Sequence, residues 1–125
     1  MKSRLAAVVF FLLSCCTAFA QEGHPYEGTW RGTIGSGGSA KPIVMIIDYD
    51  GEQLNGMIDP GRNSYRFENA THDAPNWKIE VSTKNRAGEA IEFSAVMHEI
   101  GSARRYMEGT WTQDGQQQPF KITRE

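Results

Sequence analysis

The three histidines of this 125-residue chain, His24, His72 and His98, are the side chains best suited to bind a metal ion or to move a proton. No two of them stand in the H-x-H or H-x-x-x-H spacing that brings two imidazoles to one metal ion. His72 and His98 each precede a carboxylic acid, but neighbours along a strand point to opposite faces of a sheet. The sequence therefore predicts neither a metal site nor a histidine–carboxylate pair for acid–base catalysis.

Carboxylates also gather around one expected turn, at Asp48, Asp50, Glu52 and Asp59. Their spacing is not that of an EF-hand calcium loop, so we expect solvated turn residues there. The glycine-rich stretch 35–39 precedes a β-branched segment rather than a helix, whose N-terminus would be needed to bind phosphate. None of these patterns predicts a metal, a nucleotide or another cofactor.

The composition is typical of one soluble globular domain, with 39% hydrophobic and 22% charged residues. Two of the 13 basic side chains, Lys2 and Arg4, lie near the N-terminus. The rest of the chain has 11 basic and 15 acidic groups, a net charge of −4, and no basic run. Because binding to nucleic acid or to an anionic membrane depends on clustered lysines and arginines, we expect neither partner.

Residues 1–20 have the pattern of an export signal peptide. They combine a positive start, an apolar run over 5–13 and an Ala-Phe-Ala cleavage site ending at Ala20. The apolar run is too short for a permanent transmembrane helix. We therefore predict cleavage after Ala20, a mature domain of residues 21–125 without a transmembrane segment, and a periplasmic or secreted location.

An alternative leader ends at Cys15. The sequence Leu-Leu-Ser-Cys at 12–15 resembles the lipobox of bacterial lipoproteins, in which the cysteine is acylated and anchors the protein to the outer membrane. Both cysteines, Cys15 and Cys16, precede Gln21, so cleavage after Ala20 leaves no thiol for a disulfide, a nucleophile or a metal ligand. The intact mass of the mature protein distinguishes the two leaders.

Beyond residue 27 the sequence has the pattern of short strands joined by turns. Apolar and polar residues alternate most clearly at 77–84 and 90–98. Asp-Gly and Asp-Pro-Gly turns separate several of the segments. The expected strands are 28–34, 41–50, 53–59, 64–70, 77–84, 90–98, 104–113 and 119–124, with 71–76 as a loop.

One four-residue phrase, Glu-Gly-Thr-Trp, occurs twice, at 27–30 and 108–111. Each copy lies just downstream of a tyrosine and continues into strand-like residues. We interpret the copies as the first strand and a late strand of one sheet whose ends meet. Sequential hairpins favour an up-and-down arrangement. The predicted fold class is all-β: a single eight-stranded antiparallel up-and-down barrel, preceded by a signal peptide.

Three stretches make the chain resemble small exported bacterial domains of the lipocalin-like (calycin) type. They are Gly-Thr-Trp-Arg-Gly at 28–32, Gly-Thr-Trp-Thr-Gln-Asp-Gly at 109–115 and Pro-Phe-Lys-Ile-Thr-Arg at 119–124. Gly-Met-Ile-Asp-Pro-Gly at 56–61 is similar to the third strand and turn of these domains. The resemblance covers residues 27–125 and implies a lipocalin-like barrel.

The resemblance also implies how the barrel closes. In lipocalins a tryptophan of the first strand packs against an arginine of the last strand, which corresponds here to Trp30 and Arg124. A guanidinium plane over an indole contributes about 1–2 kcal/mol when the pair is partly desolvated. The residues expected to close the barrel are Gly28, Trp30, Gly109, Trp111 and Arg124.

Eight-stranded barrels are either filled by their own side chains or hold one small ligand, and the sequence leaves both alternatives open. The inward candidates for an apolar lining are Met45, Ile47, Tyr49, Phe67, Trp77 and Phe93. Candidates for polar contacts at the mouth of the barrel are Tyr49, Tyr65, Arg105 and Tyr106.

Three functions agree with these patterns. The first is an exported, non-enzymatic barrel that binds a small apolar or amphipathic ligand or a partner protein. The second is a small lyase, cyclase or isomerase, which requires an inward-facing acid such as Asp48, Glu80 or Glu92. The third is a structural envelope protein that pairs as a homodimer through the apolar side chains of Val44 and Ile46.

Overall fold

The computed structural model describes residues 24–125 of the chain. The expected signal peptide, its cleavage site after Ala20 and the alternative acylation site at Cys15 lie outside the described residues. Within the described part no helix is long and apolar enough to cross a membrane.

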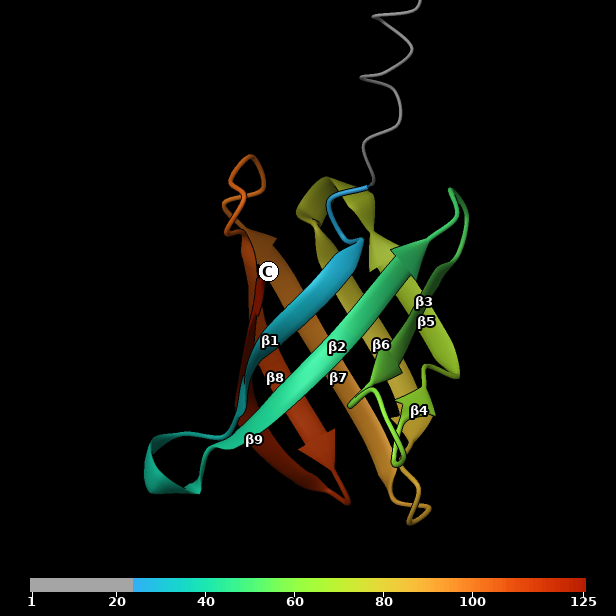
Figure 1. Ribbon diagram of the computed structural model, residues 1–125, viewed down its shortest axis with the longest axis vertical. Helices are drawn as coiled ribbons and strands as arrows, with labels where there is room; N and C mark the ends of the chain where they lie inside the picture. The colour runs from blue at the N-terminus through green and yellow to red at the C-terminus, as the bar shows by residue number, and fades with distance from the viewer. Residues whose placement is uncertain (1–23) are drawn as a thin grey trace, which may run out of the picture.

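Nine antiparallel strands form one sheet that curls strongly into a half-barrel (Figure 1). The strands are β1 (Gly28–Ile34), β2 (Lys41–Tyr49), β3 (Leu54–Ile58), β4 (Tyr65–Arg66), β5 (Asn69–Asp73), β6 (Lys78–Lys84), β7 (Ala90–His98), β8 (Tyr106–Gln113) and β9 (Gln116–Arg124). Two short 3-10 turns, η1 (Gly37–Ser39) and η2 (Ala74–Asn76), join strands, and residues 24–125 contain no α-helix. The predicted all-β antiparallel class is therefore confirmed.

The first and last strands lie side by side, as the repeated phrase predicted. The order across the sheet is β4-β3-β2-β1-β9-β8-β7-β6-β5. Strand β9 is flanked by β1 and β8, the two strands that contain the Gly-Thr-Trp copies. Trp30 pairs directly with Arg124 across β1 and β9. Because every strand is antiparallel to its neighbours, short turns suffice for most of the connections.

The predicted count of eight strands was wrong, because the expected strand 64–70 is two strands with different partners. Strand β4 pairs with β3, and β5 pairs with β6. The switch occurs within two residues: the amide of Phe67 donates to the carbonyl of Gly56 (3.0 Å), and the amide of Glu68 donates to the carbonyl of Ser82 (3.2 Å). The segment between β4 and β5 thus bridges the two ends of the strand order.

Several other boundaries differ from the sequence-based expectation: β2, β3 and β8 are one or two residues shorter than the expected 41–50, 53–59 and 104–113. The expected loop 71–76 begins as part of β5, and β9 starts at Gln116 rather than at residue 119. Trp77 does not begin a strand but ends η2 in the left-handed region, with φ 50° and ψ 39°. A bulky side chain rarely adopts this conformation, so the packing around Trp77 must hold it there.

Alternation along the strands places apolar side chains on the concave face of the sheet. Full burial of a valine, leucine, isoleucine, phenylalanine or methionine side chain contributes about 1.5–3 kcal/mol to folding. The buried side chains are Tyr26, Trp30, Ile43, Met45, Ile47, Leu54, Ile58, Ile79, Val81, Ile91, Phe93, Ala95, Met97, Met107, Trp111, Phe120 and Ile122.

Candidate functional site

The six side chains expected to line a pocket lie in or beside this core. Met45, Ile47 and Phe93 are buried, and Tyr49, Phe67 and Trp77 are partly buried and pack against the core. The ring of Phe93 stacks on Trp111 with centroids 5.4 Å apart and planes 7° apart. Phe67 meets Phe93 edge-on at 5.7 Å. Packed rings therefore occupy the interior along the middle of the sheet.

The three acids that the catalytic alternative required to face inward, Asp48, Glu80 and Glu92, are all exposed. Each stands at a strand position that alternates with buried apolar neighbours, so its carboxylate points outward. None of the three provides a buried general acid or base.

A group of aromatic and imidazole rings gathers at one end of the half-barrel. We call it the aromatic cluster, and its members are His24, Tyr26, Tyr49, His72 and Trp77. His24 stacks on Tyr26 (5.1 Å, 25°) and lies 4.4 Å from the ring centroid of Tyr49. Tyr49 meets His72 edge-on at 5.1 Å, and Trp77 lies 5.7 Å from Tyr26.

Four separate segments place these rings together. Tyr49 ends β2, His72 lies in β5 and Trp77 follows η2. His24 and Tyr26 belong to the segment 24–27 that leads into β1, which we call the lead-in. In Figure 1 the lead-in is the blue segment near the top, beside the connection between β5 and β6. The curl of the sheet, rather than adjacency in the strand order, brings β2 and β5 to the same place.

The lead-in is attached to the sheet mainly through its own carbonyl groups. The indole Nε1 of Trp30 donates to the carbonyl of Tyr26 (2.8 Å). The guanidinium of Arg105 donates from Nε to the carbonyl of Pro25 (2.7 Å). The bond from Arg105 has a charged donor and is therefore among the stronger ones, and together the two contacts hold the lead-in over the end of the sheet.

Arg124 provides a third attachment. Its Nε donates to the carbonyl of Glu27 (2.6 Å), and its guanidinium lies against Gly28. The resemblance to lipocalins implied that this guanidinium covers the indole of Trp30. The two residues are register partners across β1 and β9, and the guanidinium binds the main chain of the lead-in. The cation–π contact found among residues 24–125 joins Lys121 and Tyr106 instead, so the register of the pair is shown and its stacking stays a prediction.

Two polar atoms inside the aromatic cluster lack hydrogen-bond partners among residues 24–125: the hydroxyl of Tyr26 and Nδ1 of His72. Tyr26 is completely buried. Burial above all, then the charge of Asp73 and the nearby Tyr49, raise the pKa of Tyr26 to about 12. The phenol is therefore a neutral donor at physiological pH. Unpaired buried polar groups are costly, and native proteins contain few of them.

His24 is neutral in the form that the structure shows. Partial burial first, and then the neighbouring His72, lower the pKa of His24 below its ordinary value. Glu27 acts in the opposite direction, and Arg105 lowers the pKa further. The Nδ1 atom accepts a hydrogen bond from the amide of Tyr26 (3.3 Å), which requires this nitrogen to be unprotonated.

The sequence does not predict that these five rings come together, although two members, Tyr49 and Trp77, were expected to line the barrel. Of the residues expected at a mouth, Tyr49 and Arg105 are at this end. Tyr106 lies on the outer face, with Nζ of Lys121 4.4 Å above its ring, and Tyr65 lies in the short strand β4.

The third histidine lies apart from the other two. His98 stacks on Tyr106 (5.0 Å, 19°), and its Nε2 is 3.3 Å from a carboxylate oxygen of Glu108. Tyr106 and Glu108 both lie on β8, the strand that pairs directly with the β7 strand of His98. Among the described residues no group of three or more histidine, cysteine or acidic side chains is arranged to hold a metal ion.

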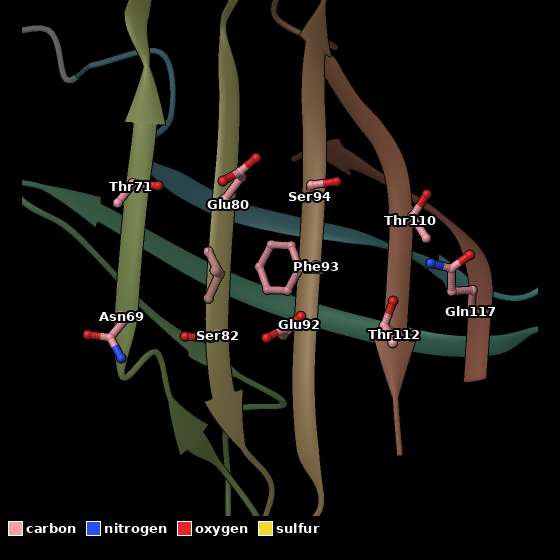
Figure 2. A pocket seen from close by; sticks show the side chains of 11 residues that line it. Asn69, Thr71, Glu80, Ser82, Glu92, Phe93, Ser94, Thr110, Thr112 and Gln117 are labelled. Carbon is pink, nitrogen blue, oxygen red and sulfur yellow. The ribbon is translucent and has the colours of Figure 1, made fainter. Parts of the chain in front are cut away.

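A second feature, a shallow groove of about 550 Å³, crosses the outer face of β5 to β9 (Figure 2). Strand pairing aligns its side chains in two rows. One row is Thr71, Glu80, Ser94 and Thr110, and the other is Asn69, Ser82, Glu92, Thr112 and Gln117. The rows contain hydroxyls, amides and two carboxylates. Val81 and Phe93 also line the groove, so its lining is mixed, whereas small-molecule pockets are mainly apolar.

The residues expected for a homodimer contact lie on the outer face of β2. Val44 is half-buried, and Ile46 is 40% exposed. Ile46 is the one large apolar side chain classed as exposed in the described part of the chain.

Comparison with known proteins gives this chain no relative: no protein-family model, no curated protein and no solved structure matches it.

Proposed function

We propose that the protein is an exported, non-enzymatic domain of the lipocalin-like type that binds a small amphipathic molecule at the aromatic cluster. The observation that supports this most is a pair of buried polar atoms, in Tyr26 and His72, that have no hydrogen-bond partner among residues 24–125. A ligand with one polar group and a planar or apolar body satisfies both parts of this site. Its polar group pairs with the hydroxyl and the imidazole, and its body packs against the rings.

The polarity of the two atoms defines the ligand further. The Tyr26 hydroxyl is a donor, because its raised pKa keeps it protonated. A neutral imidazole has one donor and one acceptor nitrogen, so Nδ1 of His72 can serve in either role. A ligand hydroxyl, which both accepts and donates, fits this pair. The export part of the proposal depends on the leader pattern of residues 1–20.

The binding test uses 2-naphthol, a fluorescent planar molecule with one hydroxyl. We expect saturable binding to the wild-type protein. Tyr26→Phe removes the donor and should weaken binding by about fivefold to tenfold, since one hydrogen bond contributes about 1 kcal/mol. Tyr106→Phe is the matched control, because Tyr106 lies on the outer face, and it should bind like the wild type. Absence of saturable binding, or equal effects of the two substitutions, would reject the proposal.

A second proposal concerns self-association through Val44 and Ile46. It is supported by the exposure of Ile46, whose register partner on β3 is another apolar residue, Met57. Single apolar residues on a surface are common, so the association must be measured directly. Light scattering should show a dimer for the wild type and a monomer for Ile46→Asp. A wild-type monomer at high concentration would remove this proposal.

A further inference from the structure

His24 lies over the aromatic cluster through contacts that depend on a neutral imidazole. Its Nδ1 accepts from the amide of Tyr26 (3.3 Å), and a protonated nitrogen is a donor that cannot accept. Its ring also lies against the rings of Tyr26 and Tyr49. Protonation at Nδ1 therefore breaks the one hydrogen bond that this ring makes with residues 24–125, and it leaves two donors facing each other.

The groups around His24 come from several elements. His72 projects from β5, Arg105 from the turn before β8, and the phenol of Tyr49 from the end of β2. Within the lead-in, Glu27 favours a positive charge on His24, whereas His72 and Arg105 oppose it. Partial burial, the largest influence, also opposes the charge.

The charge of this end of the sheet changes with pH. The charged groups that act on the tyrosine, histidine and arginine side chains here include Arg105, Arg124, Glu27 and Asp73, and Lys78 and Glu80 lie near His72. Protonation of His24 adds a positive charge to this end of the sheet. Histidine is the side chain whose ordinary titration falls in this range of pH.

We infer that acidification turns the aromatic cluster into a site for an amphipathic carboxylate, with His24 as the group that controls access to it. The inference rests on the proposed ligand-binding function and adds the class of ligand and its regulation. The displaced imidazole uncovers the ring faces of Tyr26 and Tyr49, against which the apolar body of the ligand packs. The Tyr26 hydroxyl and the Nδ1 of His72, in the tautomer that carries its hydrogen there, then both donate to the carboxylate oxygens.

The test compares two probes with the same ring system, 2-naphthoate, which is anionic, and 2-naphthol, which is neutral. Binding is measured at about pH 7.5 and about pH 5.5, on either side of the ordinary pKa of histidine. We expect the affinity for 2-naphthoate to rise about tenfold at the lower pH, and the affinity for 2-naphthol to rise clearly less. Near-UV circular dichroism at both pH values shows that the protein stays folded.

Substitutions assign the effect to the two imidazoles. The double variant His24→Gln/His72→Gln should lose the acid-dependent increase for 2-naphthoate, whereas His98→Gln should keep it, because His98 lies on the outer face beside Glu108. An increase that persists in the double variant overturns the inference. An equal increase for both probes also overturns it, since a carboxylate would then have no advantage.

A measurement without ligand separates this inference from the proposed function. The amide of Tyr26 donates to His24 when the His24 imidazole is neutral. Hydrogen exchange of this amide should therefore accelerate on acidification, beyond the change in the intrinsic exchange rate. His24→Gln should remove the extra acceleration. If neither probe binds at either pH, the proposed function fails, and control of access by His24 is kept only if this acceleration is seen. An unchanged Tyr26 amide overturns the control of access.

Discussion

Gly28 and Arg124 are so close that no side chain fits between them. A Cβ atom on residue 28 would lie 2.5 Å from Nε of the Arg124 guanidinium and 2.8 Å from its Cζ. Gly28 also has φ 129°, a conformation that side-chain-bearing residues rarely adopt. The guanidinium can therefore reach the carbonyl of Glu27 only because the strand starts with a glycine.

The substitution Gly28→Ala should destabilise the protein by about 2–4 kcal/mol, through backbone strain and displacement of the guanidinium. Thermal unfolding should show this as a fall in Tm of about 10 °C or more. Gly101→Ala is the control, because residue 101 has open space around it. In an Arg124→Ala background the cost of Gly28→Ala should shrink, and an unchanged cost would show that the guanidinium is not responsible.

Tyr26→Phe should make the protein more stable, by about 1 kcal/mol. The hydroxyl is buried and has no hydrogen-bond partner among the described residues, so its desolvation costs free energy that no hydrogen bond offsets. The substitution removes this cost and leaves the ring in place. Chemical denaturation measures the change. A loss of stability would mean that the hydroxyl is paired in solution, for instance through an ordered water.

Stability should decline in mild acid. The folded state holds the pKa of His24 below its ordinary value of 6.5, so the unfolded chain binds this proton more readily. The contribution of His24 is then complete above about pH 6.5 and is lost as the pH falls through the lowered folded-state pKa. Denaturation curves across this range should be flatter for His24→Gln than for the wild type. The same slope in both proteins would exclude His24 as the source.

Two tyrosines should resist ionisation in alkali. Burial is the main cause that raises the pKa of Tyr26 and of Tyr65 to about 12 in each case. Since the unfolded phenol titrates near 10, the contribution of each residue is complete below about pH 10 and is lost as the pH rises towards 12. Ultraviolet titration should show one late-ionising tyrosine fewer in Tyr26→Phe. An identical late phase would contradict the burial of this ring.

Gly109→Ala should be among the most damaging single substitutions. A Cβ atom on residue 109 would lie 1.9 Å from the carbonyl oxygen of Ser94 on the neighbouring strand β7. Because that atom belongs to the main chain, the two strands themselves must move apart, at a cost of about 3 kcal/mol or more. Thermal unfolding compared with Gly101→Ala measures the loss. Near wild-type stability would show that β7 and β8 can separate locally.

The sequence predicted the sheet well wherever the signal was local. The alternation at 77–84 and 90–98 corresponds closely to β6 and β7. The repeated phrase correctly predicted that the first strand of the sheet lies beside a strand from the end of the chain. The change of partner at Phe67 and Glu68 was missed, because it depends on which strands flank the segment in space and not on its own composition.

The aromatic cluster was missed for the same reason. Reasoning about histidine spacing excluded pairs that are close in sequence, but His24 and His72 approach each other only because the sheet curls. In the sequence, Tyr26 stands out only as the tyrosine that precedes the first Glu-Gly-Thr-Trp copy. Its complete burial follows from the lead-in crossing the end of the sheet, which no pattern in residues 24–27 indicates.

The attachment of the lead-in through its carbonyl oxygens has an evolutionary consequence. Arg105 and Arg124 bind the main chain at Pro25 and Glu27, whose side chains take no part in these two bonds. The side chains at positions 25 and 27 can therefore change during evolution while the two arginine–carbonyl hydrogen bonds are kept. By contrast, a residue inserted into or deleted from the lead-in would move these carbonyl oxygens away from the guanidinium groups of Arg105 and Arg124. Selection should therefore preserve the length of the lead-in more strictly than the identity of its residues.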